Sequence, residues 1–138
     1  TGQSGQLAIA VDDLTSYFVE GQGQLWERQA LCKARPIYGG AAIQNAAMAT
    51  IADIIRSVPW SAQTASEIYE MRLRLQQTAT PQNLKRGEGG TLDIEFVIQA
   101  LQIKLAGSHP GIVRSGTLAS LEPLVAAGAL DAEQAWLL

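Results

Sequence analysis

The chain has 138 residues, of which 47% are hydrophobic and 17% charged, so it is long enough to bury the core of one domain. Its net charge of −3 argues against a nucleic-acid-binding protein, which needs a basic surface to neutralise phosphates. Cys32 is the single cysteine, which excludes an internal disulfide and fits a reducing compartment. The sequence also lacks a signal peptide and an apolar run of about 18 residues, so we expect neither a membrane span nor export.

The pattern of the sequence predicts an all-α fold, a helical bundle of about six to seven helices with a short extended N-terminal lead-in over residues 1–11. Alanine and leucine dominate, and glycine and proline stand between the apolar runs rather than inside them. Asp12 or Asp13 is the expected cap of the first helix, and Asp131 of the last. We expect helices over 12–20, 24–35, 41–57, 61–78, 91–105, 115–128 and from 131 onward.

Helical spacing predicts which side chains of each helix face the core. In the third helix the inward set is Ile43, Ala47, Ile51, Ile54 and Ile55. Ala65, Ile68, Met71 and Leu75 form the inward set of the fourth helix, whereas Glu67, Glu70 and Arg74 point outward.

The stretch 83–102 is the least generic part of the chain, because a basic pair runs through three glycines directly into an amphipathic helix. Thr91 stands where an N-cap belongs, and Asp93 falls in the first turn, where negative charge is favoured. An apolar face is expected to pack, and a polar stripe is left to meet a partner. The apolar set is Ile94, Val97, Ile98, Leu101 and Leu105, and the polar stripe is Glu95, Gln99 and Gln102.

Asp93 and Glu95 invite a metal-site interpretation, since acidic pairs at this spacing can hold divalent ions. That geometry requires a strand, because on a helix the two side chains lie roughly 200° apart. We therefore favour Asp93 serving the helix N-terminus and Glu95 binding a nearby cation such as Lys85, Arg72 or Arg74. The turn at Gly87, Gly89 and Gly90 could present N–H groups to an anion, but a plain left-handed turn is the more common use of such glycines.

The helix at 24–35 carries Trp26 and three cations, Arg28, Lys33 and Arg35. A surface helix whose long cationic stems cover apolar neighbours is the simplest interpretation. Cys32 is interpreted as a small packing residue and His109 as a solvent-facing loop residue, because neither has a partner for catalysis or metal binding.

Three longer motifs stand in order along the chain. They are Trp-Glu-Arg-Gln-Ala-Leu-Cys-Lys-Ala-Arg-Pro from Trp26, Met-Arg-Leu-Arg-Leu from Met71, and Leu-Lys-Arg-Gly-Glu-Gly-Gly-Thr-Leu-Asp-Ile-Glu-Phe-Val-Ile-Gln from Leu84. In sequence and spacing they resemble the glutamine synthetase adenylyltransferase family, as do Gly-Gln-Ser-Gly from Gly2 and Gly-Thr-Leu-Ala-Ser-Leu-Glu from Gly116. The resemblance therefore spans nearly the whole chain.

This resemblance implies a bifunctional regulatory nucleotidyltransferase, which transfers AMP from ATP to a tyrosine of glutamine synthetase and removes it again, using Mg²⁺. The family's metal-holding Gly-x-Ser-Asp-x-Asp turn is absent here, so the chain alone is expected to be inactive. Residues 1–36 correspond to the C-terminal tail of a nucleotidyltransferase domain and 37–138 to a helical domain truncated at its C-terminus. A start without Met and an end inside an apolar pattern also suggest a piece of a longer protein.

By resemblance, a set of basic residues faces the nucleotide or the catalytic domain, and further residues form the interface or structural motif. The first set is Arg28, Lys33, Arg35, Lys85 and Arg86, and the second is Trp26, Glu27, Gly87, Gly89, Gly90, Asp93 and Glu95. Expected partners are glutamine synthetase, a PII-type signalling protein and the nucleotidyltransferase domain of the same protein, in a bacterial cytoplasm. The alternative is a non-catalytic helical module that docks glutamine synthetase or a PII-type protein.

Overall fold

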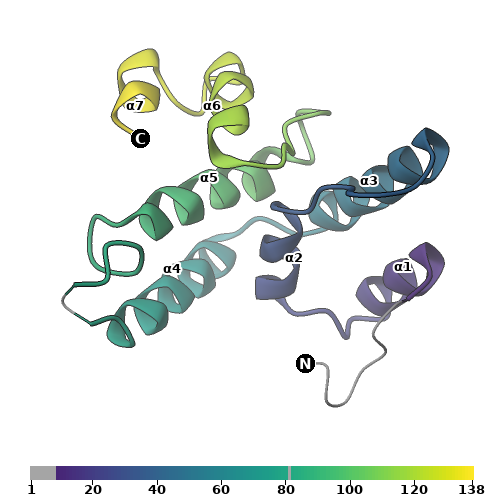
Figure 1. Ribbon diagram of the computed structural model, residues 1–138, viewed down its shortest axis with the longest axis horizontal. Coiled ribbons are helices and arrows are strands. Elements are labelled where there is room, and N and C mark those ends of the chain that lie inside the picture. Colours follow the sequence, from purple (N-terminus) through teal and green to yellow (C-terminus); the bar gives the residue numbers. More distant parts are fainter. Residues whose placement is uncertain (1–8, 81) are drawn as a thin grey trace.

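The computed structural model describes residues 9–80 and 82–138, and within these ranges it contains seven α-helices and no strand (Figure 1). The helices are α1 (Val11–Val19), α2 (Leu25–Leu31), α3 (Ala41–Arg56), α4 (Ala62–Gln77), α5 (Thr91–Leu105), α6 (Thr117–Ala126) and α7 (Ala132–Leu137). The predicted all-α bundle is confirmed. The predicted lead-in over 1–11 lies outside the described residues apart from its last three, of which Val11 already belongs to α1.

The helices are arranged around α5 and the short helix α2. Helices α4 and α5 lie side by side, joined at one end by the glycine-rich turn of residues 83–90, and α2 packs against α3, α4 and α5 (Figure 1). α1 lies along α3, α6 packs against α5, and α7 packs against α6. The segment around α2 and the helix after the glycine turn, far apart in sequence, are therefore neighbours.

One hydrophobic core joins all the helices between α2 and α6. Ile55 and Leu124 are fully buried, and Cys32 of the segment after α2 is 2% exposed. The core cluster comprises Cys32, Ile51, Ile55, Ile68, Ile98, Ile103, Ala106, Ile112 and Leu124. Residues after α2 thus share a core with the rest of the bundle, and the expected packing role of Cys32 is confirmed.

Several predicted helix ends differ from the observed ones. α2 ends at Leu31, four residues before the predicted stop, because the chain already turns at Cys32 and Lys33 and is no longer helical before Pro36. Asp131 does cap α7, since its carboxylate accepts from the Gln134 N–H at 2.7 Å. The predicted Asp cap of α1 is wrong, because Ala10 is the N-cap and Asp12 lies inside the first turn.

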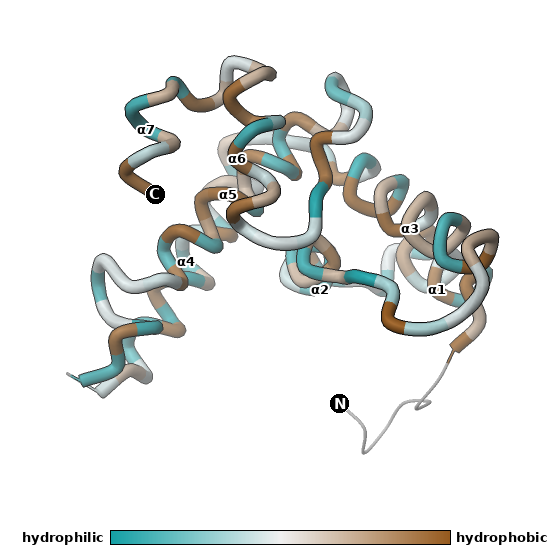
Figure 2. Tube along the Cα trace, turned by 45° about the horizontal axis from the view of Figure 1, so that its top comes forward, coloured by the Kyte–Doolittle hydropathy of each residue, from teal (hydrophilic) through white to brown (hydrophobic). Residues whose placement is uncertain are grey.

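The inward face of α3 is also shorter than predicted. Ile51, Ile54 and Ile55 are buried, but Ile43 is 65% exposed because the first turns of α3 extend beyond the body that the other helices form. Figure 2 shows hydrophobic and hydrophilic residues alternating along α3, turn by turn, as an amphipathic helix requires. Among the described residues, none of the helices is both long and apolar enough to span a membrane.

Candidate functional site

The predicted apolar face of α5 packs against the core except at Val97, but two residues of the predicted free polar stripe are buried as well. Gln99 and Gln102 of the predicted free polar stripe are 8% and 1% exposed, whereas Val97 of the predicted packing face is 45% exposed. The polar stripe faces α2 and α6, and its amides are bonded there. The polar side of α5 is therefore an internal surface, and that part of the prediction is wrong.

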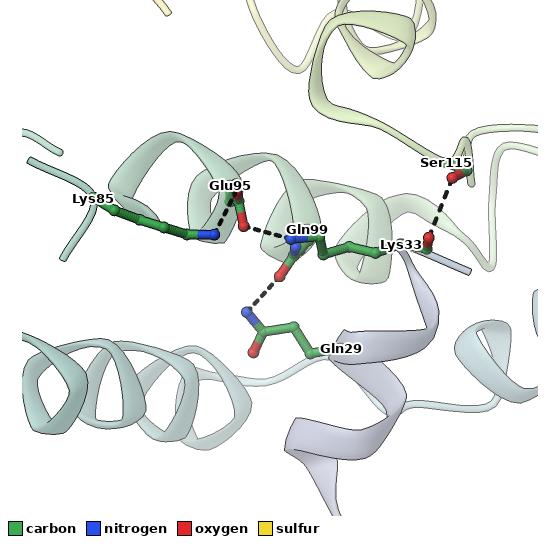
Figure 3. Close-up of polar contacts among 6 residues, drawn as sticks. All are labelled: Gln29, Lys33, Lys85, Glu95, Gln99 and Ser115. Atoms are coloured by element: carbon green, nitrogen blue, oxygen red, sulfur yellow. Dashed lines mark hydrogen bonds and ion pairs between the residues drawn. The ribbon is translucent and has the colours of Figure 1, made fainter. Parts of the chain in front are cut away.

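Glu95 lies where two cations from distant segments meet (Figure 3). Lys33, just after α2, places Nζ 2.7 Å from Oε2 of Glu95, and Lys85 of the glycine-rich turn places Nζ 3.9 Å from Oε1. The Glu95 side chain is 19% exposed, whereas those of Lys33 and Lys85 are 51% and 60% exposed, so solvent reaches the cluster from the lysine side. Of the three cations predicted for Glu95, Lys85 is confirmed; Lys33 is the closer partner and was not predicted.

Two further hydrogen bonds extend the contact between the α2 region and the rest of the bundle beyond Glu95. Gln29 of α2 donates from Nε2 to Oε1 of Gln99 at 2.8 Å, and the Ser115 hydroxyl donates to the Lys33 carbonyl oxygen at 3.2 Å (Figure 3). We call the set Gln29, Lys33, Lys85, Glu95, Gln99 and Ser115 the polar seam. It joins α2 and the segment after it to α5, to the turn before α5 and to the loop before α6.

Gln102 anchors the other end of the same stripe. Its Nε2 donates to the Arg114 carbonyl oxygen at 2.9 Å and to the Ser120 hydroxyl at 2.7 Å, which holds the loop before α6 against α5. Sequence reasoning missed Gln29, Gln99, Gln102 and Ser120 as buried polar groups. The one available signal was the spacing of the stripe itself, which indicates a common face but not what covers it.

The glycine-rich turn, residues 83–90, is folded tightly on itself. Gly90 permits a close backbone approach, because a Cβ there would lie 2.6 Å from the Leu84 carbonyl oxygen and 2.7 Å from that of Lys85. Gly89 has φ +69°, the left-handed conformation that glycine adopts without strain. Gly90, not Thr91, is the N-cap of α5, so the predicted Thr91 cap is wrong.

A clamp made by Arg72 and Asp93 holds this turn at the start of α5. Oδ1 of Asp93 accepts from Arg72 Nε at 2.5 Å, while Oδ2 accepts from the Gly89 N–H at 2.8 Å. Arg72 also donates from Nη2 to the Gly87 carbonyl oxygen at 2.9 Å, and its side chain is only 5% exposed. The predicted place of Asp93 in the first turn of α5 is confirmed, and its cation is Arg72 of α4.

The backbone donors of the turn are largely committed within the chain. The N–H groups of Lys85 and Arg86 bond to Oδ1 of Asn83, that of Gly87 to the Asn83 carbonyl oxygen, and that of Gly89 to Asp93. An anion here would therefore be held by the side chains of Lys85 and Arg86 rather than by a nest of N–H groups. This geometry favours the plain turn over a phosphate loop.

Asp93 and Glu95 face different partners, as their spacing on a helix requires. Asp93 is bonded to Arg72 and Gly89, and Glu95 is paired with Lys33 and Lys85. Among the described residues no group of three or more His, Cys, Asp or Glu side chains could hold a metal ion together. The carboxylates here bind the chain's own cations.

Arg28 of α2 is a tertiary clamp rather than a surface cation. Its guanidinium donates to the Phe18 carbonyl oxygen at 2.8 Å and to that of Ile54 at 3.0 Å, and it lies 4.8 Å from the centre of the Phe18 ring. Burial lowers the pKa of Arg28 from its ordinary value. Arg28 thereby ties α1, α2 and α3 together.

The remaining predicted residues of this region are placed near α2. Glu27 accepts from the Tyr17 hydroxyl at 2.9 Å and from the Gln24 N–H at 2.8 Å, which makes it the N3 residue of a capping box. The hydrogen bond that the Tyr17 hydroxyl donates to Glu27 raises the pKa of Tyr17. Trp26 is 55% exposed, and Arg35 is exposed in the segment after α2.

Cys32 and His109 lie outside the polar seam. Burial raises the pKa of the Cys32 thiol to about 12, so the sulfur is protonated and unreactive at neutral pH. His109 lies in the turn after α5, as predicted, where it is partly exposed and bonds to the Ser108 hydroxyl at 2.9 Å.

The fold and the site define an all-α domain in which a glycine turn and the helix after it are held to an N-terminal segment by ion pairs and amides. Family models match both parts. Residues 1–50 match the model described as Glutamate-ammonia ligase adenylyltransferase, and residues 62–138 match the model described as GlnD PII-uridylyltransferase. The polar seam therefore joins the two matched segments.

Curated relatives agree over nearly the whole chain. A bifunctional glutamine synthetase adenylyltransferase/adenylyl-removing enzyme of Stenotrophomonas maltophilia is 31% identical over 136 residues, covering 96% of this chain and 14% of that protein. Enzymes of the same name from Idiomarina loihiensis and Bradyrhizobium diazoefficiens are 33% and 32% identical, covering 83% and 88% of this chain but only 12% and 13% of those proteins. The chain belongs to the glutamine synthetase adenylyltransferase family, and it spans about one seventh or less of the relatives it matches.

Proposed function

We propose that this chain is a non-catalytic helical domain of a bifunctional nucleotidyltransferase that adenylylates and de-adenylylates a tyrosine of glutamine synthetase in a bacterial cytoplasm. The observation that carries the proposal is the polar seam. Its members Lys33 and Glu95 come from the two longest motifs of the family resemblance, and they form an ion pair at 2.7 Å. The seam would brace the catalytic domain's C-terminal tail, residues 1–36, against the helical domain, residues 37–138.

The chemistry of the described side chains does not fit a Mg²⁺ or triphosphate centre. Both oxygens of Asp93 and both oxygens of Glu95 already face cations or N–H donors of the chain. In our proposal ATP and Mg²⁺ belong to the nucleotidyltransferase domain of the longer protein, and Lys33, Lys85 and Arg86 border its cleft. The 138-residue chain alone is then inactive, and calorimetry should detect no micromolar binding of ATP or AMP.

A charge exchange in the longer protein tests the seam directly. Lys33→Glu or Glu95→Lys alone places like charges in contact and should lower the rate of AMP transfer to glutamine synthetase about tenfold, corresponding to roughly 1.4 kcal/mol. The double variant restores an ion pair between positions 33 and 95 but leaves the Lys85 ammonium beside the new cation, so it should recover part of that rate. Glu122→Lys, on the exposed surface of α6, is the matched control and should leave the rate unchanged.

The same variants separate bracing from nucleotide contact. If Lys33 contacts ATP, the double variant stays impaired and its KM for ATP rises, which contradicts the bracing role. If the seam braces the two domains, the single variants lower kcat, and the KM for ATP changes little.

A second candidate function is a protein-interaction module that docks glutamine synthetase or a PII-type signalling protein. Large exposed side chains favour it, because Tyr38, Leu84 and Trp136 are 93%, 88% and 84% exposed. Calorimetric titration of the 138-residue chain with purified glutamine synthetase, and separately with a PII-type protein, tests this candidate. Tight binding of either protein by the chain alone supports it, and no binding of either argues against it.

A further inference from the structure

A groove of about 420 Å³ runs between α4 and α5, on a different face of α5 from the polar seam. Its walls are mostly apolar, and they include Trp60, Ile68, Tyr69, Phe96, Val97 and Leu101. Tyr69 is 63% exposed and Val97 is 45% exposed, so the groove opens to solvent. Pockets with apolar walls and few polar groups are the usual form of binding sites in proteins.

Arg72 lies in the wall of this groove and has an uncommitted donor. Its Nε binds Asp93 and its Nη2 binds the Gly87 carbonyl oxygen, but Nη1 is buried without a hydrogen-bond partner among the described residues. A buried donor without a partner costs about 1–3 kcal/mol, so such groups are rare in folded proteins. An acceptor oxygen of a bound molecule would remove this cost.

The charges around the groove favour an acidic occupant. Lys104 is exposed in the lining, and Arg72 lies in the lining near the start of α5. Asp93 is the one carboxylate of the lining, and its two oxygens already accept from Arg72 and Gly89. Cations with available donors thus flank an apolar floor, which is complementary to an apolar side chain that has carboxylates beside it.

We propose that the groove between α4 and α5 binds an acidic amphipathic helix of a protein partner. A large apolar side chain of that helix inserts between Tyr69 and Val97, and a carboxylate beside it accepts from Arg72 Nη1. A second carboxylate meets Lys104. The mode is a helix laid into a groove formed by two helices, and it is independent of the adenylyl-transfer function proposed above.

Fluorescence titration of the 138-residue chain provides the test. The probe is a synthetic amphipathic peptide with leucine and phenylalanine at helical spacing and glutamate elsewhere. Its two counterparts carry lysine in place of glutamate, or serine in place of the apolar residues. Trp60 is half-buried in the groove, so the glutamate peptide should shift tryptophan emission to the blue, and Trp60→Phe should remove that shift.

Two surface variants locate the binding without disturbing the Arg72 clamp. Val97→Asp and Lys104→Glu each place a negative charge in the lining, and each should weaken binding of the glutamate peptide about tenfold. Val19→Asp on α1 and Arg74→Glu on the outward face of α4 are the matched controls. Both residues are exposed outside the lining, so these variants should keep the affinity of the unchanged chain.

The outcomes separate the occupants. The proposal holds if the glutamate peptide binds, both counterparts bind at least about tenfold more weakly, and the two lining variants lose affinity. It is overturned if the lysine peptide binds equally well, or if Val97→Asp and Lys104→Glu bind like the controls. Self-association of the chain that Val97→Asp abolishes, seen by analytical ultracentrifugation, would also overturn it, because a second copy would then cover the groove.

Discussion

Replacing Asp93 by Ala should destabilise the chain more than any other single change at an ion pair of the described residues. The carboxylate accepts from Arg72 at 2.5 Å and from the Gly89 N–H at 2.8 Å, and its removal leaves an arginine that is 5% exposed without its counter-charge. Breaking a fully buried pair costs about 3–5 kcal/mol. Because the Asp93 side chain is itself 36% exposed, solvent reduces this cost, and we expect about 2–3 kcal/mol.

The matched control is Asp53→Ala, which removes an ion pair of the same chemistry from α3. Asp53 and Arg56 are 68% and 45% exposed, so their pair is worth about 0–1 kcal/mol. Urea denaturation followed by far-ultraviolet circular dichroism measures both variants, and thermal unfolding should show Asp93→Ala melting about 6–12 °C below the unchanged chain. Equal losses of stability in the two variants would refute the reasoning.

Three further predictions concern the turn, the amide stripe and the buried thiol. Gly90→Ala should cost more than about 1 kcal/mol because its Cβ would meet three carbonyl oxygens, whereas Gly107→Ala, which meets open space, should be nearly neutral in the same urea assay. Gln102→Met should cost about 1–3 kcal/mol because the Ser120 hydroxyl loses the Gln102 donor and the Arg114 carbonyl oxygen loses the shorter of its two hydrogen bonds, and hydrogen exchange should quicken at the start of α6. For Cys32 the folded pKa of about 12 exceeds the ordinary value of 9.0, so its contribution is complete below pH 9 and is lost as pH rises through 12. The stability difference between the unchanged chain and Cys32→Ala, measured in urea, should therefore shrink over that range; a constant difference would contradict it.

The helices were predictable from sequence because their signals are local. Glycine and proline separate the apolar runs, Asp131 caps its own helix through a residue three positions on, and Asp93 stands in the first turn of α5. Such signals need nothing beyond the segment itself. They fail at α2, where the turn after Leu31 ends the helix before Pro36 can, and at Thr91, because the cap of α5 depends on a glycine approached by the backbone of Leu84.

The candidate site was only partly predictable, because its partners are distant in sequence. Gln99 and Gln102 look like a solvent-facing stripe unless Gln29 and Ser120 are known to cover them. Hydropathy alone counts an amide as polar and cannot count the hydrogen bonds that permit its burial. Glu95 was expected to bind a cation, and it does, but its closer partner Lys33 lies 62 residues away.

The locations of the predicted cations also depend on tertiary packing. Arg28 was expected on a surface stripe, but its guanidinium donates to carbonyl oxygens of α1 and α3. Arg72 was one of the cations predicted for Glu95, but it binds Asp93 instead. Arg35, Lys85 and Arg86 remain exposed, so their expected role beside a nucleotide or a catalytic domain stays a prediction. Their contribution is measurable only in the longer protein.

The most direct test of the proposed function is AMP transfer to purified glutamine synthetase from radiolabelled ATP and Mg²⁺. Two proteins are compared: the 138-residue chain, and a longer chain that also carries the nucleotidyltransferase domain of our proposal. Our account predicts that only the longer chain labels glutamine synthetase. The rate should fall with Lys33→Glu and recover in part when Glu95→Lys is added. Label transferred by the 138-residue chain by itself would contradict the account.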